Sequence, residues 1–370
     1  MERGERYTPP AMPASPLVLG IETSCDDTAC AVLDGEGRVL SSVVSSQLAV
    51  HRPYGGVVPE IASREHLANW PVVSREALER AGVPLRDMEV VAATRGPGLV
   101  GALLVGLSIG KAIAFAGGRP FHAVHHLEGH LFSPFLRPPG DPAPPAPQPG
   151  RFVGLVLSGG HTSLFAVEEG EVSTLGETRD DAIGEVFDKV GKRLGLPYPQ
   201  GPQVDELAEL GAPGAFRLPV ARFGRAEDDL DFSYSGLKSQ TLLEIERLER
   251  TIGPVDLGDS AGDAEPPQPV LDLLAAFREA AVGQVLDRLD RLQARRPIER
   301  LAVSGGAAAN RLLRRELPAW AERHGVELRL VPMVYSGDNA AMIAHAALLR
   351  HRRGSAGDPL AAEAASRIPL

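Results

Sequence analysis

The segment HHLEGH, His125–His130, combines residue types that can bind a metal ion. On a helix each residue turns the chain by about 100°, so His126 and His130 lie about 40° apart on one face, which lets two imidazoles bind one metal. Glu128 lies about 200° from His126, almost on the opposite face. In zinc peptidases of the HExxH type the glutamate directly follows the first histidine. The segment therefore fits a metal site better than a peptidase, and histidines that only pack or cap a helix are the alternative.

A third ligand for such a metal has to come from elsewhere in the chain. Asp338, in the loop SGDN, is a candidate, because two histidines and one carboxylate with open positions suit iron(II). An aspartate in front of a helical stretch is also a good N-cap. The pattern alone leaves both roles open.

Two glycine turns indicate an anion site. LSGGHTS, residues 157–163, lies between two apolar stretches, and its glycines allow close approach of a phosphate to backbone N–H groups. A second turn, Ser304–Gly306, lies between a strand and a helix, where N–H groups and the helix dipole favour an anion, and Asn310 follows it. Each turn alone fits a tight connection equally well. Together they predict a nucleotide site.

Acidic side chains occur in two further places where a structural and a functional interpretation compete. Asp26 and Asp27 occupy a predicted hairpin turn, where carboxylates can hold Mg²⁺, take up a proton or simply favour the turn. In RDDAIGEVFDKVGKRLG the apolar side chains share one helical face, namely Ile183, Phe187, Val190 and Leu194. The acidic ones lie opposite, namely Asp181, Glu185 and Asp188, and either face solvent or bind a ribose or an amine.

The elements that must position these residues form an internal repeat. GIETSCDDTACAVLDGEGRV and FVGLVLSGGHTSLFAVEEGEV both read as strand, small polar turn, strand, acidic-glycine turn and strand. Helices and strands alternate after each copy, with helices expected at 59–81, 99–116, 270–294, from 307 and from 339, and strands at 88–94, 300–304 and 326–333. This alternation predicts α/β sheets with ligand loops meeting between two lobes.

Proline-rich and acidic stretches divide the chain. We expect a disordered leader at 1–16, an N-terminal lobe at 17–124 and a C-terminal lobe at 125–338, with a proline-rich loop at 138–150 and an acidic loop at 253–269. A C-terminal helix, 339–370, is expected to pack back on the N-terminal lobe.

Composition narrows the class of protein. The leader has no apolar core like that of a signal peptide, and Cys25 and Cys30 form no CxxC motif, which together fit a reduced cytoplasmic setting. The apolar run 99–116 contains Lys111 and three glycines, so we expect a buried, glycine-packed helix and no membrane partner. The net charge of −10 argues against a broadly basic nucleic-acid binder but allows a local basic patch, for which Arg217, Arg222 and Arg225 are candidates, or partners that supply the charge.

These motifs, in this order, resemble the universal tRNA threonylcarbamoyladenosine (t6A) transferase family, formerly described as a sialoglycoprotein endopeptidase. The resemblance runs from about Val18 to Ala346. It rests on nine segments: GIETSCDDTACAV, YGGVVPEIASREH, GPGLVGALLVG, HHLEGHL, LVLSGGHTSL, DDAIGEVFDKVGKRLGLPYPQGP, DFSYSGLK, SGGAAANR and DNAAMIAHA.

The resemblance implies an actin-like, sugar-kinase-like and Hsp70-like ATPase fold with two duplicated lobes and a central cleft. It implies transfer of the threonylcarbamoyl group from threonylcarbamoyl-AMP to N6 of adenosine 37 in tRNAs that read codons beginning with A. The implied metal, Fe²⁺ with Zn²⁺ or Mg²⁺ as substitutes, is bound by His126, His130 and Asp338. The implied adenylate-binding residues are Val156, Leu157, Ser158, Gly159, Gly160, Asp188, Gly201, Asp205 and Asn310.

The implied partners are tRNA, an inactive paralogue of the same fold and a small P-loop ATPase. Three positions depart from the family pattern: Gln200 and Ala340 replace common glycines, and Asp27 replaces a frequent glutamate. Because the substrate is already a mixed anhydride, no enzyme nucleophile is needed, and Asp26 is our candidate for taking up the amine proton. The alternatives are an ATP-dependent sugar or acyl kinase of the same fold, which would lack the paired histidines, and a metallopeptidase, disfavoured by Glu128.

Overall fold

The structure is a computed structural model that describes residues 16–138, 141, 149–221, 230–258 and 265–370. The expected leader, except Pro16, therefore lies outside the described residues, as do most of the proline-rich loop and the centre of the acidic loop. Arg222 and Arg225 also lie outside, whereas Arg217 is described and exposed.

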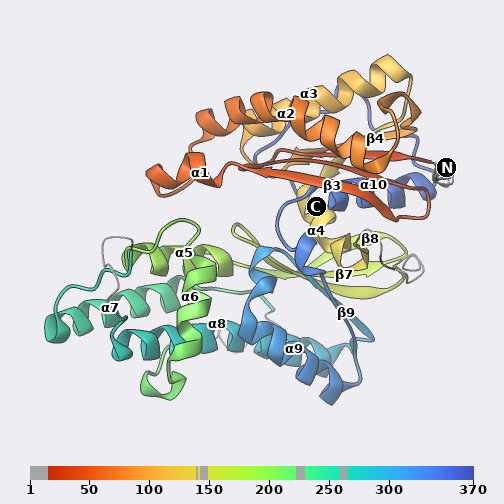
Figure 1. The fold of residues 1–370 in the computed structure, drawn as a ribbon. Helices are drawn as coiled ribbons and strands as arrows, with labels where there is room; N and C mark the ends of the chain where they lie inside the picture. The colour runs from red at the N-terminus through yellow and green to blue at the C-terminus, as the bar shows by residue number, and fades with distance from the viewer. Residues whose placement is uncertain (1–15, 139–140, 142–148, 222–229, 259–264) are drawn as a thin grey trace, which may run out of the picture.

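Two five-stranded sheets with the same topology form the centres of the two lobes (Figure 1). The first has the order β3-β2-β1-β4-β5 and consists of β1 (Val18–Glu22), β2 (Asp27–Leu33), β3 (Val39–Ser46), β4 (Val90–Gly96) and β5 (Phe121–His125). The second has the order β10-β9-β6-β7-β8 and consists of β6 (Phe152–Leu157), β7 (Thr162–Glu168), β8 (Glu171–Glu177), β9 (Arg300–Ser304) and β10 (Glu327–Leu330). In each sheet the first three strands are antiparallel and the other two join in parallel, which confirms the predicted duplication.

Helices cover the sheets, mostly where the sequence predicted them. Those of the first lobe are α1 (Leu48–His51), α2 (Pro59–Ala81) and α3 (Val100–Gly117), with α4 (His126–Phe132) leading from it into the second lobe. The second lobe has α5 (Ile183–Arg193), α6 (Gly201–Leu207), α7 (Ser235–Ile252), α8 (Gln268–Arg295) and α9 (Arg311–His324). The expected helix at 59–81 matches α2, because Pro59 suits the first helical turn and Gly82, at φ +67°, ends the helix.

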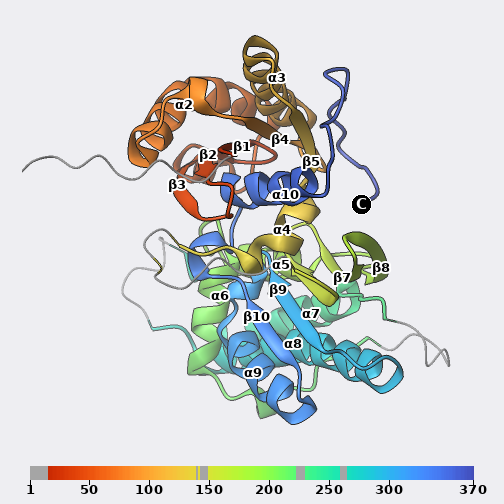
Figure 2. The ribbon, with the colours of Figure 1, turned by 90° about the vertical axis from the view of Figure 1, so that its right-hand side faces the viewer.

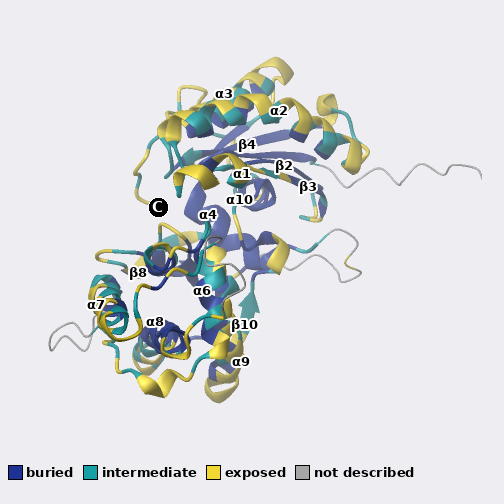
Figure 3. Ribbon diagram, turned by 60° about the vertical axis from the view of Figure 1, so that its left-hand side comes forward, coloured by how far each residue is buried: buried dark blue, intermediate teal, exposed yellow. Residues whose placement is uncertain are grey.

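Helix α10 (Ala340–Arg352) returns to the first lobe and packs on the inner face of its sheet (Figure 2). Its residues Ala340–Leu349 are all buried, in a core that also contains Val18 of β1, Leu131 of α4 and Phe165 of β7. Figure 3 shows α10, β2 and β4 mainly buried, whereas α2 and α3 expose their outer surfaces. A single core thus joins α10, α4 and both sheets.

The expected C-terminal helix 339–370 is wrong beyond Arg352. Gly354 has φ +87° and Gly357 has φ +98°, conformations that end a helix, and Pro359 follows. The remaining chain lies as an extended tail along the first sheet, where the N–H of Asp358 donates to the carbonyl of Phe121 at 2.6 Å.

Helix α3 is glycine-packed on one face only. A Cβ on Gly106 would lie 2.4 Å from the Thr23 hydroxyl, and one on Gly110 would lie 2.9 Å from the Phe121 ring. Among the described residues it is the one helix long and apolar enough to span a membrane, with one third of the span buried. The prediction of a buried helix is wrong for its outer face, where Leu104 is 50% exposed and Phe115 is 76% exposed.

Candidate metal centre and interlobe cleft

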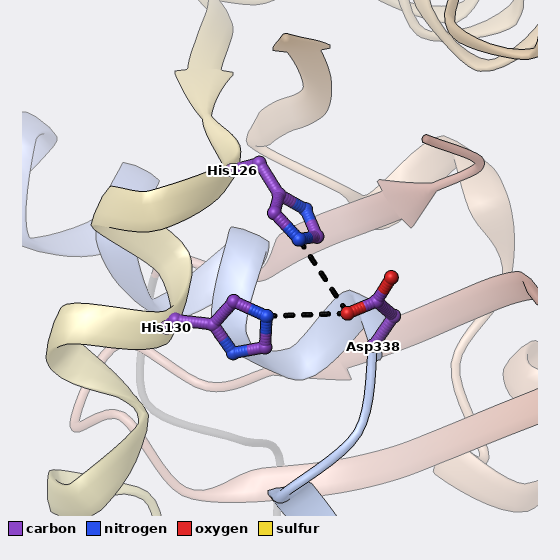
Figure 4. A group of neighbouring side chains, drawn as sticks. All are labelled: His126, His130 and Asp338. Carbon is purple, nitrogen blue, oxygen red and sulfur yellow. Dashed lines mark hydrogen bonds and ion pairs between the residues drawn. The ribbon is translucent and has the colours of Figure 1, made fainter. Parts of the chain in front are cut away.

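The two histidines of α4 and the aspartate that precedes α10 meet between the lobes. Figure 4 shows both imidazoles projecting from α4 toward Asp338. Oδ1 of Asp338 lies 3.4 Å from His126 Nε2 and 3.2 Å from His130 Nε2, and the three ligand atoms lie within 4.8 Å of one another. The N-cap of α10 is Asn339, whose Oδ1 accepts from the N–H of Met342 at 2.9 Å. The alternative of Asp338 as the cap is therefore excluded.

His126 is oriented by groups behind it. Its Nδ1 lies 3.1 Å from Oε2 of Glu22, at the end of β1, and 3.2 Å from the hydroxyl of Ser24. Thr94 Oγ1 donates to the same Glu22 oxygen at 2.7 Å. Metal-binding histidines commonly place their second nitrogen against a carboxylate in this way. Glu22 was not predicted as a site residue. The one feature of the sequence that could have indicated it is a charged residue at the end of an otherwise apolar strand.

The electrostatics also favour a cation here. Although burial opposes protonation, the carboxylates of Asp338 and Glu22 raise the pKa of His126 well above its usual value. Burial alone would raise the pKa of Asp338, but His126 and His130 hold it well below the usual range. Two imidazoles and one carboxylate, facing one another and partly open, fit a divalent transition metal.

Glu128 faces away from this centre, as the helical geometry predicts. Its two oxygens accept from Nε (2.9 Å) and Nη2 of Arg350 on α10, and the Glu128 side chain is 9% exposed. Burial would lower the pKa of Arg350, but Glu128 raises it. This glutamate therefore joins α4 to α10 and is in no position to activate a water on the metal, which contradicts the peptidase alternative.

The β1–β2 turn places two carboxylates at the cleft. Oδ2 of Asp26 accepts from the hydroxyl of Tyr198 at 3.2 Å, across the lobes. Burial, followed by the negative charge of Asp338, raises the pKa of Asp27 to about 7. Asp26 thus contacts the second lobe across the space between the lobes.

The β6–β7 turn offers backbone groups to the cleft. The N–H of Ser158 donates to the carbonyl of His161 at 2.8 Å, while the N–H of His161 donates to the Ser158 hydroxyl at 3.1 Å. Gly159 and Gly160 are exposed, and a Cβ on either would meet nothing within 4 Å. Val156 and Leu157 have fully buried side chains, so they can offer only backbone to a ligand.

The second glycine turn is a tight turn directly after β9. Gly305 has φ +93°, and a Cβ there would lie 2.2 Å from the carbonyl oxygen of Leu157. A short 3₁₀ turn, Gly306–Ala309, separates it from α9, so the helix expected from Ala307 begins at Arg311.

The other predicted adenylate residues form two hydrogen-bonded groups. Oδ1 of Asp188 accepts from the N–H groups of Gln200 at 3.1 Å and Gly201 at 2.7 Å, which fixes α5 against the start of α6. Oδ1 of Asp205 accepts from Asn310 Nδ2 at 2.7 Å. Asp205 is 6% exposed.

Asp205 and Asn310 hold the start of α9. Oδ2 of Asp205 accepts from the N–H of Arg311 at 2.9 Å, and Oδ1 also contacts Arg278 Nη1 at 3.2 Å. Oδ1 of Asn310 caps the helix by accepting from the N–H of Leu313 at 3.0 Å. Asp205 acts as a positioning residue in this structure, since both of its oxygens already accept hydrogen bonds.

Two further expectations can be compared with the structure. Asp181 forms ion pairs with two lysines, because Lys189 Nζ lies 2.6 Å from one of its oxygens and Lys238 Nζ lies 2.6 Å from the other. It is therefore neither a solvated charge nor an isolated carboxylate of the cleft. Gln200, with φ −83°, and Ala340, in the first turn of α10, adopt ordinary backbone conformations, so neither replacement of a glycine requires a shifted loop.

The sequence of this chain is similar to those of known proteins of one family. The sequence model of the TsaD family, described as tRNA N6-adenosine threonylcarbamoyltransferase, matches residues 38–345. Proteins of that name from Pelobacter propionicus and Anaeromyxobacter dehalogenans are 50% identical over 329 residues and 47% identical over 358 residues. These alignments cover 89% and 95% of this chain, and 90% and 99% of the relatives.

Similarity to solved structures concerns the fold alone. HypF from T. kodakarensis superimposes with a TM-score of 0.58 at 13% identity, covering 93% of this chain and 48% of that one. Full-length HypF in its phosphate- and nucleotide-bound form gives a TM-score of 0.57, also at 13% identity, with 94% and 57% coverage. The two-lobed actin-like, sugar-kinase-like architecture is thereby confirmed. By its sequence, the chain belongs to the tRNA N6-adenosine threonylcarbamoyltransferase family.

Proposed function

We propose that this protein transfers the threonylcarbamoyl group from threonylcarbamoyl-AMP to N6 of adenosine 37 in tRNAs that read codons beginning with A. The observation that carries the proposal is the meeting of His126, His130 and Asp338 between the lobes of a family member. A sugar or acyl kinase of the same fold would not need this pair of histidines. The Glu128–Arg350 contact counts against a peptidase.

In the reaction the adenosine amine attacks the carbamoyl carbon, a C–N bond forms, and the bond from that carbon to the phosphate oxygen breaks. AMP leaves with the electron pair, and the amine proton passes to a base. His126, His130 and Asp338 would hold Fe²⁺, or Zn²⁺ or Mg²⁺ in its place, which polarises or anchors the threonylcarbamoyl group when bound. The chain itself contributes placement of the two substrates in the cleft.

The adenylate-binding part of the proposal rests on the β6–β7 turn and the groups beyond it. Gly159 and Gly160 leave backbone N–H groups uncovered by any side chain, which suits a phosphate. Asp188 has one oxygen bound to backbone N–H groups, which leaves its other oxygen available to a ribose hydroxyl.

The test is direct. Purified protein and its proposed partners are supplied with threonylcarbamoyl-AMP and unmodified tRNA, and the digested tRNA is examined for t6A by mass spectrometry. We expect product. Absence of product from folded, metal-loaded protein would return the function to the kinase class, which can be checked by ATP consumption with sugar or acyl acceptors.

Asp26 is our candidate for taking up the amine proton. General bases contribute about 10²–10⁴-fold to a rate, so Asp26→Ala should slow single-turnover t6A formation by that factor. Tyr198→Phe, which removes only the hydroxyl bonded to Asp26, serves as the control and should change the rate by about threefold or less. A normal rate for Asp26→Ala would remove the role, and loss in Asp27→Asn instead would transfer it to the neighbouring carboxylate.

The proposed protein partners are an inactive paralogue of the same fold and a small P-loop ATPase, all acting in the cytoplasm. The exposed apolar face of α3 supports a protein partner, because exposed Leu104 and Phe115 lie on one long helix. Phe115→Asp is expected to weaken association with the paralogue at least tenfold in a calorimetric titration. Leu243→Asp on α7, where the leucine is 47% exposed, is the matched control. Equal binding by both variants would place the partner elsewhere.

A further inference from the structure

The tail that follows α10 is fixed along one edge of the first lobe. The side chain of Asp358 accepts from the N–H of Ala123 at 2.9 Å, and the N–H of Ala365 donates to the carbonyl of Arg95 at 2.9 Å. Closer to the metal centre, Nε2 of His125 lies 3.2 Å from the carbonyl of Ile368. These bonds bring residues 366–370 to the cleft, directly beside α4.

A groove of about 700 Å³ lies between this tail and the β7–β8 hairpin of the second lobe. Pro97 and Gly98 of the first lobe and Leu127 of α4 also contribute to its walls. Gly98 cannot be replaced without a shift, because a Cβ there would lie 2.5 Å from the carbonyl of Ser24. The groove therefore has walls from both lobes and from the tail.

The inner end of the groove adjoins the metal centre. Leu127 follows the ligand His126, and His161, in the β6–β7 turn, lines the groove next to the glycines expected to bind phosphate. A ligand in the groove would thus reach the same centre as a ligand on the glycine turn.

The groove and three of the predicted adenylate residues, Asp188, Asp205 and Asn310, lie on opposite sides of α4, whereas the glycines of the β6–β7 turn directly precede the groove residue His161. In Figures 1 and 2, α6, which begins at Gly201, lies on one side of α4 and β8 lies on the other, and in Figure 2 the C-terminus is on the side of β8. Asp205 is part of α6, Asp188 accepts from the N–H of Gly201 at the start of α6, and Asn310 donates to Asp205. A donor adenylate bound there would leave the groove unfilled.

A transferase with two substrates needs two binding sites that meet at the reacting atoms. The groove has the size of a small-molecule site and mixes apolar walls with hydrogen-bonding groups on His161, Thr174 and Glu177. Such groups can bind the edges of an unstacked base. Arg367, exposed at the groove, adds a cation for the phosphate backbone, which is needed in a chain of net charge −10.

We propose that this groove, closed on one side by tail residues 366–370, binds the acceptor nucleoside of the tRNA. The proposal rests on the proposed transferase function. The donor enters from the α5–α6 side and the acceptor from the β7–β8 side, so the adenosine amine and the carbamoyl carbon meet beside His126 and His130. The tail is then a positioning element for the acceptor.

Neighbouring residues of β8 provide the test. Thr174 and Ser173 are both exposed, but only Thr174 lines the groove, since successive strand residues point to opposite faces. We expect Thr174→Trp to raise the KM for tRNA at least tenfold while the KM for threonylcarbamoyl-AMP changes less than twofold. Ser173→Trp should leave both constants unchanged. Ser366→Trp, on the opposite wall, should repeat the effect of Thr174→Trp.

Each outcome bears on the proposal. An unchanged KM for tRNA in both groove variants would overturn it, as would a raised KM for the adenylate alone, which would make the groove the donor site. Thermal unfolding of the variants verifies that they fold. If wild-type protein forms no t6A, the transferase function fails and the acceptor assignment fails with it, a result distinct from normal kinetics in the groove variants.

Discussion

Replacing His130 by alanine is expected to lower t6A formation at least a thousandfold and to reduce bound metal to a small fraction of the wild-type content. His130 is fully buried, and its Nε2 is one of the three ligand atoms grouped at the centre. Without that imidazole only two ligands of the centre remain. Two ligands are too few for the protein to retain a transition metal when free metal is at micromolar concentration. Metal content after anaerobic loading with Fe²⁺ and single-turnover product formation measure the two effects.

Graded variants separate loss of a ligand from loss of its support. Asp338→Ala should match His130→Ala, whereas Glu22→Gln, which alters only the group behind His126, should weaken metal binding by about 10–100-fold. His324→Ala removes a partly exposed histidine on α9 and is the control. Full metal content and a normal rate in His130→Ala would show that these residues do not form the metal site.

Replacing Glu128 by alanine is expected to destabilise the protein by about 3 kcal/mol while leaving the metal in place. The change leaves Arg350 largely buried with only the more distant carboxylate of Asp358, at 3.6 Å, and breaking a buried pair typically costs about 3–5 kcal/mol. Because Arg350 retains 28% exposure, we expect the lower end of that range. Denaturant unfolding measures the change.

Two comparisons sharpen this prediction. Glu76→Ala breaks the exposed Glu76–Arg80 pair and should change the free energy of unfolding by less than about 1 kcal/mol. The double variant Glu128→Met/Arg350→Met should recover part of the lost stability, because well-packed apolar residues can replace a buried pair. A chelator-sensitive peptidase activity that disappears in Glu128→Gln would instead revive the peptidase alternative.

Much of the scaffold follows from local sequence patterns. Short apolar strands separated by small polar and glycine turns predicted both hairpins, and Pro59 with Gly82 marks the limits of α2. The histidine spacing alone predicted that Glu128 faces away from the metal. These features depend on neighbours in sequence, where chain geometry leaves few alternatives.

Features that depend on distant contacts could not be predicted in this way. Nothing local marks Glu22 as the partner of His126, or Asp205 as the residue that holds the start of α9. Whether Asp338 caps a helix or binds a metal depends on α10 returning to α4, and only the family resemblance favoured the metal. The tail after Arg352 lacks periodicity, and its path depends on the unpaired edge of β5, which no local pattern reveals.

The position of α10 has a consequence for synthesis of the protein. This helix covers the inner face of a sheet whose strands are translated first, while the whole second lobe lies between them in the chain. During translation the sheet therefore emerges with its apolar inner face uncovered, and the candidate metal site still lacks Asp338. Such long-range closure is slow and exposes the nascent chain to aggregation. We expect the N-terminal lobe to require chaperone protection until the ribosome has released α10, and metal to enter only after that.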